Sequence, residues 1–480
     1  MEGLLISEYD DYSSDIALAT DFYELAMAAA YYYSNNDGVQ ENTKKNGIFE
    51  MFVRKLPLNR AYLVAAGLEQ AMYFLMNMKF NDKHTSYLKS LQTFKKVGED
   101  FFEYLKRFKF TGTVWAVPEG TILFPNEPMI RIEAPIIEAQ IVETYLLSTI
   151  NFQTLIATKA SRIVTAANDK AVIEFGSRRA HGPQAGLLAA RASYIGGCVG
   201  TSNALAGYKL GIPVFGTMAH SYIMSFEKEE EAFKQFSKVF PSGFLLVDTY
   251  DSIAAVKKII RLGIHTNGIR LDSGDLYYLS VKSRKLLDNA AGYNDTKIMA
   301  SGDLNEYLIR DLVTKGAPID SFGVGTELST SRDDPAMNGV YKLVAITMHR
   351  TSEDGKKRKR RKQDDDILLY KLKTSPGKET YPGPKQIYRI IENNKIKKDW
   401  LILEDEKQTR NCIGIPLLRK LFEGGKLLCR LPSIKEIQRY HFQQIDSLPT
   451  QFNDLDFEPR EFPVMYSKKL KTIIQEFKPG

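Results

Sequence analysis

Short apolar segments alternate with amphipathic segments in the middle of this chain of 480 residues, over about 140–347. The apolar segments have the length of buried strands, and the segments between them have helical spacing. Repeated strand-then-helix units predict an α/β fold with a parallel sheet, open or closed. The expected strands are Ala171–Phe175, Val214–Gly216, Phe244–Val247, Gly268–Leu271, Lys297–Ala300 and Phe322–Val324, and the clearest helices are Ser252–Leu262, Leu276–Asn289 and Leu304–Lys315.

Polar and glycine residues follow almost every one of these expected strands. The clusters are Arg178-Arg-Ala-His181, Thr217-Met-Ala-His220, Asp248-Thr-Tyr250, Asp272-Ser-Gly-Asp275, Ser301-Gly-Asp303 and Gly325-Thr326. The carboxyl ends of parallel strands lie at one edge of a sheet, where α/β barrels and open α/β sheets bind ligands. Six clusters in series therefore predict one shared site on that rim.

The residue types on the rim restrict its chemistry. The chain has no P-loop, no complete G-x-G-x-x-G and neither the H-E-x-x-H nor the G-x-S-x-G motif. Arginines, aspartates, a histidine and glycine turns are suited instead to a phosphorylated substrate and a metal. The turns at Ser301-Gly-Asp303 and Gly323-Val-Gly-Thr326 could bind a phosphate through backbone N–H groups, or could be ordinary tight turns.

Single residues on the rim allow two interpretations each. Asp272 and Asp275 could face ribose hydroxyls or Mg²⁺, or Asp272 or Ser273 could instead cap a helix. Arg270 ends a buried strand and needs an anion, which could be a structural or a ligand carboxylate. A lone histidine such as His220 is more often structural than catalytic, but its place among phosphate-type loops favours a catalytic role.

Charge and cysteine content limit the class of protein. The net charge of +7 comes from 65 basic and 58 acidic residues, and removing 356–366 leaves 58 and 55. Much of the excess is thus local to the run Lys356–Lys362, and the charge balance does not indicate that the whole chain binds nucleic acid. Three cysteines without a C-x-x-C pair fit a reducing compartment. We expect neither a leader nor a membrane span, because the first residues are acidic and no run of 18 apolar residues occurs.

A series of motifs in this chain resembles nicotinate phosphoribosyltransferases. The motifs are Thr20-Asp-Phe-Tyr23, Phe49-Glu-Met-Phe52 with Arg54-Lys-Leu-Pro57, Phe175-Gly-Ser-Arg178-Arg-Ala-His-Gly-Pro183, Gly200-Thr-Ser202-Asn, Gly216-Thr-Met-Ala-His220-Ser, Ile269-Arg-Leu-Asp-Ser-Gly-Asp275, Ser301-Gly-Asp303 and Gly323-Val-Gly-Thr326. They follow one another in the family's order from about residue 17 to 347, and the order is more specific than any one motif.

The resemblance implies an architecture. The family has an irregular α/β barrel of the type II phosphoribosyltransferase kind and an α+β domain built from N- and C-terminal parts. The corresponding domains here are 1–139, 140–347 and 348–480. The resemblance also implies a cytoplasmic homodimer whose active sites take residues from both subunits.

The resemblance further assigns roles to single residues. Tyr23 and Phe175 would stack on the two faces of nicotinate, and Arg178 would contact the ring and the pyrophosphate. Thr217 and Arg270 match positions that contact nicotinate. Asp272 would contact the ribose and the metal, with Asp275 as a second metal ligand. The 5′-phosphate would bind at Gly302, Asp303, Gly325 and Thr326, and His220 would be phosphorylated by ATP.

The implied reaction joins nicotinate to phosphoribosyl pyrophosphate, with Mg²⁺ and with ATP hydrolysis coupled through a phosphohistidine, in NAD salvage. Nicotinamide-using relatives have an aspartate where this chain has Ser202, and an aspartate would repel a substrate carboxylate. The alternatives are a nicotinamide or a quinolinate phosphoribosyltransferase, a binding-only paralogue, and a nucleic-acid-associated protein using Lys356–Lys362.

Overall fold

The computed structural model of the chain describes residues 15–34, 45–348, 367–375, 377–406, 414–455 and 462–477. The basic run Lys356–Lys362 lies outside these described residues. The chain forms two compact units, which we call the middle unit (155–335 with 450–458) and the composite unit (1–154, 336–449 and 459–480). The three-domain division at 139/140 and 347/348 stays a prediction.

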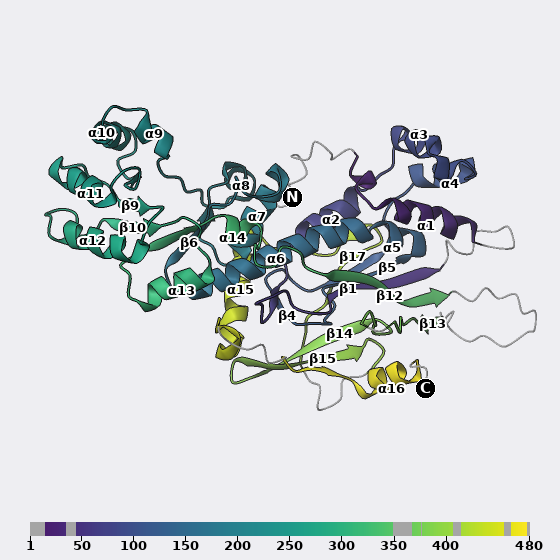
Figure 1. The fold of residues 1–480 in the computed structure, drawn as a ribbon. Helices are drawn as coiled ribbons and strands as arrows, with labels where there is room; N and C mark the ends of the chain where they lie inside the picture. Colours follow the sequence, from purple (N-terminus) through teal and green to yellow (C-terminus); the bar gives the residue numbers. More distant parts are fainter. Residues whose placement is uncertain are drawn as a thin grey trace, which may run out of the picture. The chain divides into compact units, whose positions relative to one another are not determined.

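A six-stranded parallel sheet forms the middle unit (Figure 1). Its strands are β6 (Ala171–Glu174), β7 (Gly200–Thr201), β8 (Phe244–Leu246), β9 (Gly268–Leu271), β10 (Lys297–Ala300) and β11 (Ser321–Val324), in the order β7-β6-β11-β10-β9-β8. The last strand pairs with the first, Ser321 opposite Ala171, so the strands follow one another in cyclic order as in an α/β barrel. Within 155–335, where every residue is described, no strand pairing joins β7 to β8, so the barrel is open there.

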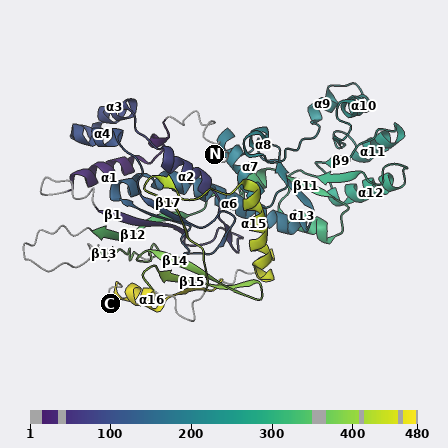
Figure 2. The ribbon, with the colours of Figure 1, turned by 180° about the vertical axis from the view of Figure 1, so that it is seen from behind.

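Helices connect these parallel strands. They are α7 (Pro183–Ile195), α8 (Ala204–Leu210), α9 (His220–Met224), α10 (Glu229–Val239), α11 (Ser252–Arg261), α12 (Leu276–Asp288), α13 (Glu306–Thr314) and α14 (Thr326–Ser329). Asp251, Asp275 and Asn305 cap α11, α12 and α13 through their side chains, which explains where these helices begin. The three helices predicted from periodicity are therefore present, and α12 packs against β9 and β10 (Figure 2).

The strand predicted at 214–216 is wrong. Only Val214 pairs, in an isolated parallel bridge with Thr201, and the chain leaves the sheet after Phe215. Pro213 has no N–H to donate and Gly216 has no side chain to pack, so this segment cannot build a full ladder. The short strand β7 takes the expected place beside β6.

The composite unit draws on both ends of the chain. Its seven-stranded sheet has the order β13-β12-β1-β5-β3-β17-β18, in which β1 (Asn46–Val53) pairs with β12 (Gly339–Met348) and β3 (Thr113–Ala116) pairs with β17 (Arg419–Glu423). The other strands of this unit are β2 (Leu63–Val64), β4 (Ile122–Leu123), β5 (Ile130–Pro135), β13 (Ile367–Tyr370), β14 (Lys385–Glu392), β15 (Lys395–Leu403), β16 (Ile415–Pro416), β18 (Lys426–Leu427) and β19 (Val464–Tyr466). N- and C-terminal strands thus share one sheet, as predicted.

Helices flank the sheets of the composite unit. They are α1 (Phe22–Tyr33), α2 (Leu68–Asn77), α3 (Asp82–Ser90), α4 (Glu99–Lys106), α5 (Ile136–Ile141), α15 (Ile434–Ser447) and α16 (Lys468–Glu476). The helix α6 (Glu143–Ala167) begins in the composite unit and ends in the middle unit. Among the described residues, no helix is both long and apolar enough to cross a membrane.

Candidate active site

Arg270 on β9 connects three segments of the rim. Its Nε donates to Ser301 Oγ at 2.7 Å, Nη1 donates to Thr217 Oγ1 at 2.8 Å and Nη2 donates to Asp272 Oδ1 at 2.6 Å. Of the two anions that the sequence allowed, a structural carboxylate is therefore present beside this arginine. The guanidinium fixes the relative positions of the ends of β9 and β10 and of the segment that precedes α9.

Asp272 is the acidic centre of this cluster. Besides Arg270, it accepts a hydrogen bond from Ser301 Oγ at 2.5 Å, and its other oxygen lies 3.7 Å from His220 Nε2. Burial alone would raise the pKa of the Asp272 carboxyl, but the Ser301 hydrogen bond and the Arg270 charge together lower it below its ordinary value. Asp272 is consequently ionised at neutral pH.

His220 is the first residue of α9 and faces this carboxylate. Its Nδ1 lies 3.1 Å from Thr249 Oγ1, and its Nε2 points to Asp272. The side chain is still 44% exposed, so the ring is oriented by protein groups yet accessible to a ligand. A histidine packed in the core would be buried, and this exposure favours the catalytic interpretation.

Two glycines allow close approach within the site. Gly302 has φ +92°, and a Cβ there would lie 1.9 Å from the Asp272 carbonyl oxygen, so only glycine fits. A Cβ at Gly323 would lie 2.5 Å from Cδ2 of Phe175. The Arg270 guanidinium lies over the Phe175 ring, 5.7 Å from its centroid. The half-buried Phe175 is thereby brought into the Arg270 cluster.

The two predicted phosphate turns follow β10 and β11. Gly302 and Asp303 are exposed, and Asp303 has a positive φ of 45°. The first N–H groups of α13, at Tyr307 and Leu308, are already bound by the Asn305 side chain. The other turn, Gly325-Thr326, leads into the single helical turn α14. A phosphate at the first turn would meet loop N–H groups, and one at the second would meet the N–H of Thr326 at the start of this short helical turn.

A helix cap is present here, but Asp275 provides it, and not Asp272 or Ser273 as the capping alternative predicts. Asp275 Oδ1 accepts from the N–H of Tyr278 at 3.0 Å, at the start of α12. Over the part of the chain that the structure describes, no group of three or more His, Cys, Asp or Glu side chains could hold a metal ion. The protein alone therefore does not form a complete magnesium site at Asp272 and Asp275, and the remaining ligands of such an ion would have to be water and substrate oxygens.

Arg178 and Ser202 lie after β6 and β7. Arg178 is exposed in the turn that precedes α7. Ser202 is half-buried, and its N–H donates to the carbonyl of Glu174 at 2.8 Å. The buried Glu174 carboxyl also accepts from Thr201 Oγ1 and from the N–H of Gly176, so it joins the ends of the two strands. Both predicted residues are thus on the rim of the sheet.

Tyr23 belongs to the composite unit, where it is the second residue of α1 and 48% exposed. Burial of the ring, followed by the nearby Glu143, raises the pKa of its phenol. Asp21 precedes this helix, but its side chain does not cap it and accepts from Thr144 Oγ1 at 3.1 Å instead.

Comparison with known proteins gives the same family over nearly the whole chain. Residues 18–151 match the nicotinate phosphoribosyltransferase N-terminal domain, 156–333 match the quinolinate phosphoribosyl transferase C-terminal domain, and 407–474 match the nicotinate phosphoribosyltransferase C-terminal domain. A nicotinate phosphoribosyltransferase of Mycobacterium tuberculosis is 41% identical over 95% of this chain and 92% of its own length. The chain belongs to the nicotinate phosphoribosyltransferase family. The Bacillus subtilis nicotinate phosphoribosyltransferase is 40% identical over 96% of this chain and 95% of its own length.

Solved structures support the fold of this family member. Human nicotinic acid phosphoribosyltransferase superposes with a TM-score of 0.79 at 26% identity, over 96% of this chain and 100% of that one. Nicotinate-nucleotide pyrophosphorylase from Pyrococcus furiosus gives 0.69 at 26% identity, over 91% and 97%. The predicted family, the enzyme class of phosphoribosyltransferase and the type II fold with its α/β barrel are confirmed.

Several residues of this phosphoribosyltransferase site were not predicted individually. Ser301 and Thr249 orient Asp272 and His220, and Ser273 Oγ donates to Asp248 Oδ2 at 2.5 Å. All four lie in the polar clusters that follow the strands. Their position in the sequence could have identified them, but their partners depend on which strands are neighbours.

Proposed function

We propose that this protein transfers the phosphoribosyl group of phosphoribosyl pyrophosphate to nicotinate, in the cytoplasm and in NAD salvage. The observation that carries the proposal is the cluster in which Arg270 holds Asp272, Thr217 and Ser301 beside an accessible His220. Aligned cationic and carboxylate groups of this kind stabilise a sugar cation and a phosphate leaving group. Curated relatives with this name support the substrate pair.

The proposed step exchanges one bond at C1 of the ribose. The pyridine nitrogen forms a bond to C1 while the C1–O bond to pyrophosphate breaks, and the leaving group keeps the electron pair. Asp272, ionised by its environment, faces the positive charge that develops on the sugar. Pyrophosphate binds Mg²⁺, which would supply charge neutralisation for the leaving group. The task of the protein is alignment of the reactants.

Recognition of nicotinate would rest on Arg270, Thr217 and Ser202. Arginine has five N–H donors, and three of those of Arg270 bind its neighbours, so two can bind the substrate carboxylate. The hydroxyl of Ser202 does not repel that carboxylate as an aspartate would. We propose that Tyr23 and Phe175 stack on the two faces of the pyridine ring and that Arg178 contacts the ring and the pyrophosphate.

The 5′-phosphate would bind at the turns after β10 and β11. Gly302, Asp303, Gly325 and Thr326 offer backbone N–H groups there, and the positive φ at Gly302 and Asp303 turns the chain sharply. Because Asp275 caps α12, we assign the protein's share of magnesium binding to Asp272 in preference to Asp275. Water and pyrophosphate oxygens would complete the ion's coordination.

ATP coupling would proceed through His220. A ring nitrogen forms a bond to the terminal phosphorus of ATP as the P–O bond to ADP breaks, and hydrolysis later releases phosphate. The carboxylate of Asp272, 3.7 Å from Nε2, stabilises the positive imidazole that precedes phosphoryl loss. Because the chain has no P-loop, ATP would use the phosphoribosyl pyrophosphate pocket.

Release of pyrophosphate tests the function. We expect turnover with nicotinate, phosphoribosyl pyrophosphate and Mg²⁺, little turnover with nicotinamide, and stimulation by ATP. His220→Ala should remove the ATP stimulation, whereas His265→Ala, an exposed histidine of the same unit, should keep it. A preference for nicotinamide would contradict the role of Ser202, and no turnover with either base would point to a binding-only paralogue.

The oligomeric state is a separate part of the proposal. The resemblance implies a homodimer whose active sites take residues from both subunits. Light scattering during size-exclusion chromatography should give about twice the chain mass of 54.4 kDa. Mixing Tyr23→Ala subunits with Arg270→Met subunits should restore part of the activity if each site combines residues of two chains, and a monomeric active enzyme would contradict sharing.

A further inference from the structure

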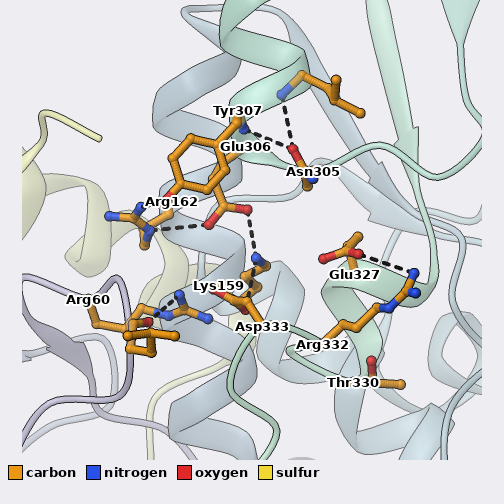
Figure 3. Close-up of polar contacts among 12 residues, drawn as sticks. Arg60, Lys159, Arg162, Asn305, Glu306, Tyr307, Glu327, Thr330, Arg332 and Asp333 are labelled. Carbon is orange, nitrogen blue, oxygen red and sulfur yellow. Dashed lines mark hydrogen bonds and ion pairs between the residues drawn. The ribbon is translucent and has the colours of Figure 1, made fainter. Parts of the chain in front are cut away.

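A buried ionic cluster lies in the middle unit outside the rim (Figure 3). Lys159 of α6 is 1% exposed, and its Nζ lies 2.6 Å from Glu306 Oε2 and 3.0 Å from Asp333 Oδ1. The Glu306 side chain is fully buried, and that of Asp333 is 19% exposed. One ammonium group therefore binds two carboxylates from different parts of the chain.

Both carboxylates come shortly after a proposed phosphate turn. Glu306 is the first residue of α13, directly after the turn at Gly302 and Asp303. Asp333 follows α14, the helical turn that begins at Thr326. Figure 3 shows both side chains pointing to the Lys159 nitrogen from these two segments. Lys159 thus connects the segment that follows one turn to the segment that follows the other.

Further contacts hold each segment to the same support. Arg162 lies three residues after Lys159 on α6, and its Nε is 3.4 Å from the second Glu306 oxygen. Its Nη2 donates to the Tyr307 hydroxyl at 3.4 Å. In the other segment, Thr330 Oγ1 donates to the Thr326 carbonyl at 2.7 Å, a local contact between the start of α14 and the residues before Asp333. The contacts of α6 itself reach the segments that follow both turns.

The composition of the cluster favours positioning over stability. Two cations and two carboxylates balance in charge, but burying them costs solvation that apolar side chains would not lose. Charged groups in such a setting hold their partners in one geometry, because any displacement leaves a buried charge uncompensated. Placement of a phosphate-binding loop needs this constraint, since an error of about 1 Å weakens catalysis strongly.

We propose that Lys159 is a positioning residue that holds the two 5′-phosphate turns in one arrangement and thereby sets the affinity for phosphoribosyl pyrophosphate. The inference rests on the proposed function of those turns. Lys159 acts through Glu306 and Asp333 and does not touch the substrate. Its loss should therefore change the binding of the phosphorylated substrate and leave nicotinate binding nearly unchanged.

Steady-state kinetics of Lys159 and Asp333 variants test the inference. Lys159→Met should raise the KM for phosphoribosyl pyrophosphate about tenfold, the equivalent of about 1.4 kcal/mol. The kcat and the KM for nicotinate should stay within about twofold of the wild-type values. Lys159→Arg keeps the charge and should recover most of the affinity. Asp333→Ala removes the link from Lys159 to the second turn and should raise the KM for phosphoribosyl pyrophosphate about threefold. Asp311→Ala, an exposed acid on α13, is the matched control and should leave all constants unchanged.

Asp333→Ala decides the matter if Lys159→Met does not fold, because the pair of Lys159 with Glu306 remains in that variant. Calorimetry of phosphoribosyl pyrophosphate with Mg²⁺ should give a matching rise in Kd without any turnover. An unchanged Kd in folded Asp333→Ala, or a fall in kcat and thermal stability at constant KM, would overturn the inference. Failure of the wild type to use nicotinate would contradict the proposed function alone, since the binding experiment does not depend on turnover.

Discussion

Each unit contains an ion pair between an arginine on a strand and an aspartate, and the two pairs are built differently. In the composite unit, Arg389 is buried and binds both oxygens of Asp399, the Gln444 side chain and the carbonyl of Ile122, at 2.6–3.2 Å. In the middle unit, Arg270 also binds a carboxylate, but Asp272 is 27% exposed and keeps one oxygen toward His220.

The difference separates a stabilising pair from a functional one. All three guanidinium nitrogens of the buried Arg389 donate to acceptors inside the protein, so the pair contributes to the fold and is not placed to bind a ligand. Arg270 and Asp272 are satisfied only in part and lie at the carboxyl ends of parallel strands, where an accessible ion pair indicates a ligand site. Four experiments can break or sharpen this distinction.

Arg389→Met should give the largest effect, a loss of about 3–5 kcal/mol in the free energy of unfolding, because Asp399 is left as an uncompensated buried charge. The two tryptophans, Trp115 and Trp400, both lie in the composite unit, so their fluorescence during urea unfolding reports on this unit. Arg419→Met, an exposed arginine of β17, should change stability by less than about 0.5 kcal/mol. Equal losses for both variants would contradict the structural role of Arg389.

Arg270→Met should act on activity more than on stability. We expect kcat/KM for nicotinate to fall about 10²–10³-fold, as for the loss of one preorganised electrostatic contact in an active site. Circular dichroism should show a folded protein, and Arg261→Met, an exposed arginine of α11, should keep full activity. If the variant stays active but unfolds readily, Arg270 and Asp272 would be a structural pair like Arg389 and Asp399.

Glu24 differs from the aspartates of both ion pairs, because it is a buried carboxyl whose hydrogen-bond partners, Thr20 and Thr144, are neutral. Burial raises its pKa to about 7, so its contribution to stability is present at low pH and is lost as the pH rises through 7. Glu24→Gln should therefore stabilise the composite unit at pH 8 by about 1–2 kcal/mol and change little at pH 4.5. Urea unfolding at both pH values checks this, with Glu476→Gln as the exposed control. An equal effect at both pH values would contradict the raised pKa.

Ser301→Ala should give the smallest effect, on the pH dependence of the reaction. Without the Ser301 hydroxyl, the pKa of Asp272 rises toward its ordinary value, so the acidic limb of the pH–rate profile moves to higher pH. The loss of one hydrogen bond should cost about 1 kcal/mol of stability. Ser225→Ala, whose hydroxyl donates to a backbone carbonyl, should leave the limb in place. An unmoved limb in Ser301→Ala would show that Asp272 does not control it.

Sequence periodicity was sufficient to predict the alternating core of the middle unit. The strands at 268–271 and 297–300 and the helices at 252 and 276 begin where the apolar and amphipathic segments predict. The rim could also be predicted, because parallel strands end at one edge. The strand at 214–216 could not, since Pro213 and Gly216 outweigh its apolar character.

Contacts between distant segments were beyond the reach of sequence patterns. Nothing near Lys159 in the sequence indicates that Glu306 and Asp333 become its partners, because these depend on how α6, α13 and α14 pack. Asp275 illustrates another limit. The sequence context favours metal binding for Asp275 and places a possible helix cap at Asp272 or Ser273, and only the contact with the N–H of Tyr278 shows that Asp275 caps α12.

The opening of the barrel after β7 gives the segment 215–219 an unusual constraint on its length. Phe215 still donates to Thr201 at 2.9 Å, and α9 begins at His220, so the residues between belong to no strand or helix. Surface connections generally tolerate insertions. One added residue can shift the following chain by up to about 3.4 Å, close to the whole separation of 3.7 Å between His220 and Asp272. An added residue in this segment can therefore separate His220 from Asp272 without disturbing any strand pairing, so the length of a connection outside the sheet helps to set the geometry of the site.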